Sequence, residues 1–384
     1  MKQKPKVLMA MSGGVDSSVA ALILKKQGYE LIGAFMKNWS DTKNLLTGDC
    51  QWKDDRKEAM KIANKLKIPI VTLDFEKQYR KSVILPMFSM YKKGITPNPD
   101  IDCNQKVKFP LLWQAAKKIG ADFIATGHYA RIKNNEMLRA KDESKDQSYF
   151  LYRLNSSDLK HSLFPVGSYT KKQIREIAKK NKFPNFNRKS TVGICFVGKI
   201  NLKKFLQQKI KPKKGKILNP EGKIIGEHDG IFYYTIGQRI GPRFGIEVDK
   251  GNEKQVKRWY VAKKIPKTNV IIAAPENNSL LFRKEFAIKN VHFMDKNFIA
   301  KIKKSKAGSS VKSSSHGLVG GNKSIKVLTR IRQVGELLPS MLKYSNGEYK
   351  IILNKPITGV SEGQAAVLYQ GTKVLGGGVI NFED

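Results

Sequence analysis

The sequence predicts an α/β protein whose N-terminal domain contains a parallel sheet and is followed by two small β-rich domains, the last a β-barrel. A strand, a glycine-containing turn and a helix follow one another over residues 6–24. Strand-length apolar runs then alternate with helical patterns as far as residue 202, after which short strands separated by turn residues replace them. We therefore expect domains at 1–202, 203–284 and 285–384.

The first strand and helix are joined by a turn suited to bind a phosphate. The apolar run Val7–Met11 stops at SGGVDSS (residues 12–18), and the apolar helical stripe of residues 19–24 follows. Paired glycines let the backbone approach a ligand closely, and the N–H groups at a helix start face an anion. A Walker loop would need a lysine after the glycines, and none is present here. The turn therefore predicts a phosphate site of another kind.

The following elements predict a nucleotide crevice. Strands are expected at 30–36, 70–73 and 121–126, with helices at 52–67 and 111–119. Strands that alternate with helices form a parallel sheet with right-handed crossovers, and ligands bind at the carboxyl ends of its strands. The turn at 12–18, Met36 and Gly127-His128 all fall at such ends, so one crevice can hold one nucleotide.

The pattern of expected elements changes in the second half of the chain. Thr170 to Gln173 has the pattern of a capping box for a helix at 174–180, which Phe183-Pro184 closes. A basic linker at 211–215 precedes expected strands, which lie at 216–225, 231–235, 325–332, 349–353 and 365–369. Residues 301–326 are rich in Ser, Gly and Lys, which predicts a mobile insertion in the barrel.

The composition is strongly basic. Lys and Arg total 72 against 32 Asp and Glu, a formal net charge of +40. Such a field favours a polyanionic partner, although part of the lysine content is an ordinary solvated surface. No apolar run reaches the roughly 18 residues of a membrane span, and residues 1–5 lead into the first strand without a signal-peptide core. We expect a cytoplasmic protein without a membrane partner.

The cysteines are few and widely spaced. Cys50, Cys103 and Cys195 never occur in C-x-x-C spacing, so they predict neither a disulfide scaffold nor a zinc site. Cys50 has no partner at metal spacing and is interpreted as structural.

The segment TPNPDIDCN (residues 96–104) predicts a chemical role for Cys103. Its two prolines favour a stiff exposed loop that presents Asn98, Asp100 and Cys103 before a new helix. Lys106 and Lys108 nearby are expected to favour the thiolate. Cys195, in the segment GICFVG, is typical of a core position when taken alone. Two thiols in one nucleotide-binding domain nevertheless suggest a sulfur relay, in which one carries a persulfide and the other resolves it.

Taken together, the motifs resemble one known family. MSGGVDSS, MKNW, TPNPDIDCN, ATGHYARI, KDESKDQSYFL, GICFVG, YTIGQR and GVSEGQAAVLY occur in this order over nearly the whole chain. In this combination the sequence resembles the bacterial tRNA-specific 2-thiouridylases, which have the pyrophosphatase (PP) loop of the ATP-α-hydrolase superfamily. The resemblance implies that ATP and Mg²⁺ serve to adenylate the C2 oxygen of uridine 34 in the anticodon loop of tRNAs for Lys, Glu and Gln. Sulfur then replaces that oxygen to give 2-thiouridine.

The resemblance also implies a set of site residues. Those expected to bind ATP are Ala10, Met11, Ser12, Gly13, Gly14, Val15, Asp16, Ser17, Met36 and Gly127, with Asp16 helping to bind Mg²⁺. The expected catalytic residues are Cys103, Cys195 and Asp100, the last as general acid or base. Those expected to contact the target base or the tRNA are Asn98, Pro99, Asp100, His128, Lys145, Asp146, Gln147, Arg330, Ile331 and Gln364. Ile331 stands where the family has a tyrosine, and residues 189–192 read KSTV where the family more often has DST.

The resemblance implies two routes for the sulfur. Cys195 accepts sulfane sulfur as a persulfide from an upstream donor, either a cysteine desulfurase or a sulfur relay protein. In one route Cys103 attacks this persulfide, which forms a Cys103–Cys195 disulfide and releases sulfide. In the other the persulfide attacks the base directly and Cys103 resolves it.

Three alternatives remain. A small-molecule ligase of the argininosuccinate-synthase or GMP-synthetase kind would share the phosphate turn but would need neither the cysteine pair nor basic β domains. A tRNA-binding protein with a decayed nucleotide site is disfavoured by the intact turn. An iron–sulfur cluster held by Cys103, Cys195 and a carboxylate such as Asp100 would keep the function and change the cofactor.

Overall fold

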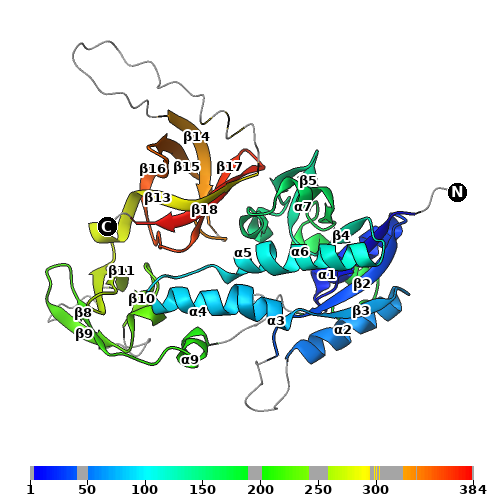
Figure 1. The fold of residues 1–384 in the computed structure, drawn as a ribbon, viewed down its shortest axis with the longest axis horizontal. Coiled ribbons are helices and arrows are strands. Elements are labelled where there is room, and N and C mark those ends of the chain that lie inside the picture. Colours follow the sequence, from blue (N-terminus) through cyan, green and yellow to red (C-terminus); the bar gives the residue numbers. More distant parts are fainter. Residues whose placement is uncertain are drawn as a thin grey trace, which may run out of the picture. The chain divides into compact units, whose positions relative to one another are not determined.

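The computed structural model describes residues 4–40, 51–188, 201–241, 258–294, 298, 300, 302, 323–333 and 335–382. Its chain forms two compact units (Figure 1). Unit 1 comprises Met1–Leu85, Pro99–Ile200 and Gln370–Leu375, and unit 2 comprises Pro86–Asn98, Asn201–Tyr369 and Gly376–Asp384. The division into three domains at 202 and 284 stays a prediction.

Unit 1 is built on a parallel sheet, as the sequence predicts. Its strand order is β3-β2-β1-β4-β7, and every neighbouring pair is parallel. Val7, Leu8 and Met9 are each at most 1% exposed, which shows that both faces of the central strand are covered. The strands are β1 (Lys6–Ala10), β2 (Glu30–Lys37), β3 (Ile70–Asp74), β4 (Phe123–Ala125) and β7 (Ser162–Leu163).

Helices connect and cover these strands. In α8 the predicted capping box is present, because Thr170 accepts from the backbone N–H of Gln173 while the Gln173 side chain accepts from that of Thr170. No helix among the described residues is both long and apolar enough to cross a lipid bilayer. The longer helices of unit 1 are α1 (Val15–Lys26), α2 (Gln51–Lys65), α6 (Phe109–Lys118) and α8 (Lys171–Lys180). Short elements are α3 (Glu76–Tyr79), η1 (Arg80–Ile84), η3 (Glu143–Lys145), η4 (Ser148–Phe150) and α7 (Ser156–Lys160), and β5 (Ala130–Lys133) pairs with β6 (Glu136–Arg139).

The segment that carries Cys103 differs from the prediction. Residues Pro99–Cys103 form a helical turn, α5, and Asn104–Lys108 continue it as a π-helix, η2. The expected exposed loop is therefore wrong, because proline is tolerated in the first turn of a helix, where its missing N–H would have no partner. Cys103 is fully buried, not presented to solvent.

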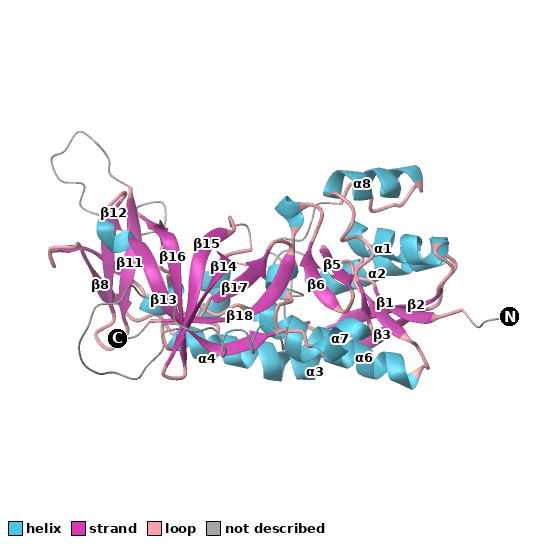
Figure 2. Ribbon diagram, turned by 90° about the horizontal axis from the view of Figure 1, so that it is seen from above, coloured by secondary structure: helices cyan, strands magenta, loops and turns pink. Residues whose placement is uncertain are grey.

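Unit 2 contains a small five-stranded sheet and a closed barrel (Figure 2). The small sheet has the order β10-β11-β12-β8-β9, and six described strands form the barrel β13-β16-β15-β14-β17-β18, in which β18 pairs back to β13. The predicted fold class, including the final barrel, is confirmed. The bounds are β8 (Gly215–Leu218), β9 (Ile224–His228), β10 (Arg239–Ile240), β11 (Trp259–Ile265), β12 (Val270–Pro275), β13 (Phe282–Phe293), β14 (Lys323–Arg330), β15 (Leu338–Ser345), β16 (Glu348–Thr358), β17 (Ala365–Gln370) and β18 (Lys373–Asn381), with helices α4 (Leu85–Lys92), α9 (Leu202–Gln207) and η7 (Ser279–Leu281).

Two local predictions in unit 2 need correction. Ile231–Tyr233, expected as part of a strand, form a 3₁₀ turn (η5), in which all three side chains are buried and Tyr233 Oη donates to Ile210 O at 2.6 Å. The insertion predicted at 301–326 ends earlier, because β14 already begins at Lys323. Residues 303–322 of that insertion lie outside the described residues.

Candidate nucleotide and sulfur-transfer site

Glycines and hydroxyl groups shape the turn after β1. Gly13 has a φ of +76°, and a Cβ there would collide with Asp55 O. Ser12 N donates to Ser17 Oγ at 3.2 Å, and Ser17 Oγ donates to Gly14 O at 3.0 Å. Gly14 is the N-cap of α1 and supplies no side-chain cap. The start of this 12-residue helix is thus open to an anionic ligand, as the sequence predicts.

Two further predicted nucleotide residues lie at the carboxyl ends of the two strands that flank β1. Gly127 follows β4, and a Cβ at this position would lie 2.7 Å from Ser17 N. Only glycine therefore allows the end of β4 to pack against the first turn of α1. Met36, near the end of β2, is 5% exposed. The structure thus brings Gly127 against the phosphate turn and places Met36 on the strand beside β1.

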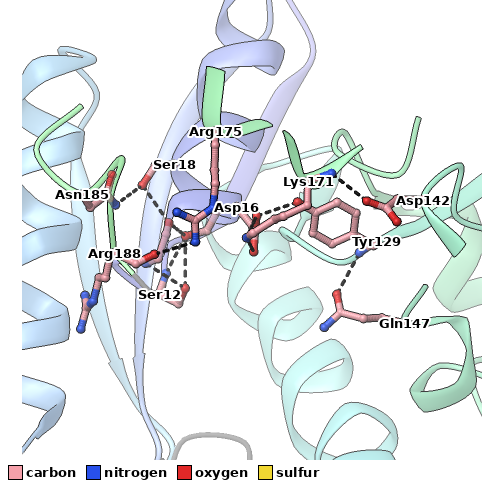
Figure 3. Close-up of polar contacts among 12 residues, drawn as sticks. Ser12, Asp16, Ser18, Tyr129, Asp142, Gln147, Lys171, Arg175, Asn185 and Arg188 are labelled. Carbon is pink, nitrogen blue, oxygen red and sulfur yellow. Dashed lines mark hydrogen bonds and ion pairs between the residues drawn. The ribbon is translucent and has the colours of Figure 1, made fainter. Parts of the chain in front are cut away.

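Asp16 is the centre of a polar network at this turn (Figure 3). Lys171 Nζ lies 2.6 Å from Asp16 Oδ1 and 2.7 Å from Oδ2, and Tyr129 Oη donates to Oδ1 at 2.8 Å. Burial and the adjacent Asp16 carboxylate raise the pKa of Tyr129 well above its ordinary value of 10.0. The phenol therefore stays protonated and acts as a donor to Asp16.

Two side chains that the sequence reasoning missed hold the backbone of the turn. Asn185 Nδ2 donates to Gly13 O and to Ser18 Oγ, both at 2.9 Å. Arg188 Nη1 donates to Gly13 O at 3.2 Å, and its Nη2 pairs with Asp55. Burial raises the pKa of Asp55, and the Arg188 charge opposes this rise. No local pattern marks these residues, since they lie more than 160 positions from the turn they support.

The predicted tRNA-contacting residues 145–147, and Asp142 just before them, are tied to the same network. Asp142 Oδ2 accepts from Lys171 N at 2.8 Å, and Gln147 Oε1 accepts from Tyr129 N at 2.9 Å (Figure 3). Lys145 is exposed, so its charge is available to a partner. Asp146 is 2% exposed and accepts from the backbone of its own segment, which makes it a structural residue in this conformation.

The candidate catalytic residues are described only in part. Cys103 is a fully buried thiol, and Asp100 lies on the preceding turn of α5. Lys106 Nζ lies 2.8 Å from Asp102 Oδ1, so this ammonium is directed at a carboxylate. Cys50 and Cys195 lie outside the described residues. The thiolate character of Cys103 and its pairing with Cys195 stay predictions.

His128 is held in a defined tautomer. Lys108 Nζ lies 3.2 Å from Nε2, and Thr126 Oγ1 lies 2.7 Å from Nδ1. Because an ammonium can only donate, Nε2 must accept and Nδ1 must carry the proton toward Thr126. Burial, together with the Lys108 charge, lowers the pKa of His128 well below 6.5. His128 is therefore a neutral residue beside Gly127, and its contact with tRNA stays a prediction.

The three predicted RNA contacts nearest the C-terminus belong to unit 2. Gln364 Nε2 donates to Thr96 O at 2.9 Å and to Pro97 O at 3.0 Å, next to Asn98. Arg330 and Ile331 are 3% and 6% exposed. Gln364 thus holds the backbone before Asn98, while Arg330 and Ile331 are packed in the barrel. Their contacts with tRNA stay predictions.

The described residues contain no group of three or more His, Cys, Asp or Glu side chains that could hold a metal ion. This finding does not extend to Cys195, so the iron–sulfur alternative stays a hypothesis. Asp16 has the hard oxygen atoms that Mg²⁺ prefers, which fits the expected role of this residue.

Comparisons with known proteins cover the whole chain. Three family models match: a tRNA methyl transferase HUP domain at residues 5–199, a tRNA methyl transferase PRC-barrel domain at 203–275 and an aminomethyltransferase β-barrel domain at 283–380. The tRNA-specific 2-thiouridylase MnmA of Bacillus licheniformis is 38% identical over 99% of this chain and 96% of its own. The protein of the same name from Coxiella burnetii is 39% identical over 99% of both chains.

The similarity to one solved structure of an RNA-modifying enzyme is weak. A 4-thiouridine synthetase in complex with RNA and ATP aligns with a TM-score of 0.34 at 15% identity, over 53% of this chain and 50% of its own. A similarity of this size carries no argument about the fold or the site.

The parallel sheet and the open, glycine-rich turn at its carboxyl edge define an α/β protein with a HUP domain. The models of two β-barrel domains match after this HUP domain, and the similarity to the named relatives extends through all three matched regions. The chain belongs to the family of the tRNA-specific 2-thiouridylases.

Proposed function

We propose that the protein is a tRNA sulfurtransferase that converts uridine 34 of tRNAs for Lys, Glu and Gln to 2-thiouridine at the expense of ATP. The observation that carries this proposal is similarity over 99% of the chain to proteins named tRNA-specific 2-thiouridylase, combined with an intact phosphate turn. The names of the three family models refer to methyl or aminomethyl transfer, but the relatives matched over at least 96% of their own length carry the thiouridylase name. The net charge of +40 suits a polyanionic substrate.

The chemistry explains why a nucleotide turn and cysteines occur in one protein. The C2 oxygen of uracil is a poor leaving group, so it must first attack the α-phosphate of ATP, which releases pyrophosphate. The open start of α1 and the hydroxyls of Ser12 and Ser17 are suited to bind that pyrophosphate. Mg²⁺ held in part by Asp16 would neutralise charge on the phosphates. Sulfur then attacks C2 and AMP departs.

The sulfur step needs two thiols for its electron balance. A persulfide on Cys195 holds sulfur at the zero-valent level, whereas the C=S group needs sulfide. Attack of the Cys103 thiolate on the persulfide supplies two electrons, forms the Cys103–Cys195 disulfide and releases sulfide, which displaces AMP. Alternatively the persulfide attacks C2 first and displaces AMP. Cys103 then cleaves the S–S bond, which supplies the same two electrons and forms the same disulfide. An external thiol reductant must afterwards restore both cysteines. Asp100, three residues before Cys103, is the candidate proton carrier.

Complementation of a strain that lacks its 2-thiouridylase tests the proposal. We expect the wild-type gene to restore 2-thiouridine in bulk tRNA, measured by mass spectrometry of nucleosides. Cys103→Ser, Cys195→Ser and Asp16→Asn should each abolish it, whereas Cys50→Ser, the matched cysteine control, should retain it. Absence of 2-thiouridine with a stably expressed wild-type protein would reject the proposed function.

Anaerobic purification separates the persulfide from the iron–sulfur route. We expect an active protein without iron. Stoichiometric iron and acid-labile sulfide that are lost together with activity would support the cluster instead.

A further inference from the structure

Lys171 is the cation in direct contact with the carboxylate of the phosphate turn. It is the first residue of α8, its side chain is only 12% exposed, and its ammonium contacts both oxygens of Asp16 (Figure 3). The turn itself has no lysine after its glycines. A helix that begins 155 residues further along the chain therefore supplies the cation that other phosphate loops carry in their own sequence.

The contact places Lys171 in competition with a metal ion. Both oxygens of Asp16 accept from the ammonium, and Oδ1 also accepts from Tyr129. Charge-assisted hydrogen bonds of this kind are strong, and a divalent cation would use the same oxygen atoms. An ammonium at both oxygens of Asp16 repels a divalent cation, so Asp16 binds Mg²⁺ more tightly when the Lys171 side chain moves away.

The backbone of Lys171 is fixed while its side chain is adaptable. Its N–H donates to Asp142 Oδ2 at 2.8 Å, and the capping box of Thr170 and Gln173 holds the preceding turn. A lysine ammonium is a compact charge on a flexible four-carbon stem. A rotation of the side chain can thus move the ammonium away from Asp16 without displacing α8 or the segment at Asp142.

We propose that Lys171 is the phosphate-binding cation of the nucleotide site, held by Asp16 in the nucleotide-free protein and transferred to a phosphate oxygen of ATP when Asp16 takes up Mg²⁺. This inference rests on the nucleotide site of the proposed function. The ammonium balances one carboxylate in the free state and part of the triphosphate charge in the bound state. The Asp16 carboxylate therefore never remains without a cation.

Two affinities that change in opposite directions test this exchange. In Lys171→Met, MgATP should bind about tenfold to a hundredfold more weakly in isothermal titration calorimetry, because one charge-assisted contact to phosphate is lost. Mn²⁺ alone, followed by its paramagnetic resonance signal, should bind about tenfold more tightly, because no ammonium competes for Asp16. Lys172→Met, which removes an exposed lysine next in sequence, should change neither affinity.

A purely structural role for Lys171 predicts a different result. Damage to the site would weaken the binding of both MgATP and Mn²⁺, and either this outcome or unchanged affinities would overturn the inference. Lys171→Arg provides the second variant if Lys171→Met does not fold: it keeps the charge, so its Mn²⁺ affinity should stay at the wild-type value, and a tenfold rise would contradict the exchange. A wild-type protein that binds no MgATP would instead reject the proposed function.

Discussion

The phosphate turn of unit 1 and the loop Ile95–Asn98 of unit 2 are both held by residues distant in sequence, but by different forces. Asp16 and Gly13 are held by charged or strongly polar side chains from Lys171, Asn185 and Arg188. The loop at 95–98 is held by a neutral amide, that of Gln364, and by close backbone packing against a glycine.

This difference has a functional meaning. The turn, which we propose receives a metal–nucleotide complex, is surrounded by charges that can exchange partners. The loop before Asn98, a predicted contact of the target base, is held by packing and by neutral hydrogen bonds. We therefore expect variants around the turn to respond to salt and pH, and variants around the loop to be largely independent of both.

The largest effect is expected at Gly363. Its φ is +86°, and a Cβ would collide with Ile95 and lie 2.8 Å from Thr96 O. Gly363→Ala should lower the free energy of unfolding by about 2–4 kcal/mol, from backbone strain and the clash together. Gly347→Ala is the matched control, because its φ is +84° but a Cβ there would meet nothing within 4 Å. If urea denaturation gave the same loss of unfolding free energy for Gly363→Ala and Gly347→Ala, the packing of Gly363 against the loop would contribute nothing to stability.

Gln364→Met comes next and compares the two regions directly. Loss of the two donors to Thr96 O and Pro97 O should cost about 1–2 kcal/mol, with little change between low and high NaCl. Arg188→Met, which removes the ion pair with Asp55, should show a loss that shrinks as NaCl rises. If the stability losses of Gln364→Met and Arg188→Met depended on NaCl concentration to the same degree, the difference between the two regions would be rejected.

His128 gives a pH-dependent effect of about 1 kcal/mol. Its pKa is low in the folded protein and returns to about 6.5 in the unfolded chain, so below that pH the unfolded state binds one more proton. The stability that the neutral His128 side chain contributes is fully present well above pH 6.5. It is lost as the pH falls below that value. Between pH 7.5 and 5.5 the wild type should therefore lose about 1 kcal/mol more than His128→Gln. Parallel pH profiles would contradict the neutral state of this ring.

The smallest effect is expected at Lys37, whose ammonium lies 3.0 Å from both Asp74 and Glu76. Hydrogen bonds to Asp74 and then Glu76 raise the pKa of Lys37, and the Lys37 hydrogen bond lowers that of Asp74. The ion pair therefore stabilises the fold above pH 3.8, the ordinary pKa of an Asp side chain. This stabilisation is lost as the pH falls through the lowered pKa of Asp74. Because Asp74 is 60% exposed, Lys37→Met should cost only about 0.5 kcal/mol at pH 7 and less at about pH 3. An equal cost at both pH values would exclude the ion pair as its cause.

The sequence predicts the scaffold better than the supporting contacts. Strands β1 to β4 of the parallel sheet and the capping box of α8 follow from local periodicity and from residues three positions apart, which a single sequence displays. Lys171, Asn185 and Arg188 could not be found in this way, because only the fold brings them to the turn. The burial of Cys103 was missed because two prolines were interpreted as excluding a helix, although Pro99 occupies the first turn of α5.

The central claim is that an ATP-dependent activation step precedes a sulfur transfer that needs Cys103. Formation of AMP and pyrophosphate from ATP, measured with unmodified tRNA alongside 2-thiouridine formation, tests it most directly. The account predicts that Cys103→Ser still releases pyrophosphate in the presence of tRNA but yields no 2-thiouridine, and that Asp16→Asn forms neither. Formation of 2-thiouridine by the wild type without release of AMP would contradict it.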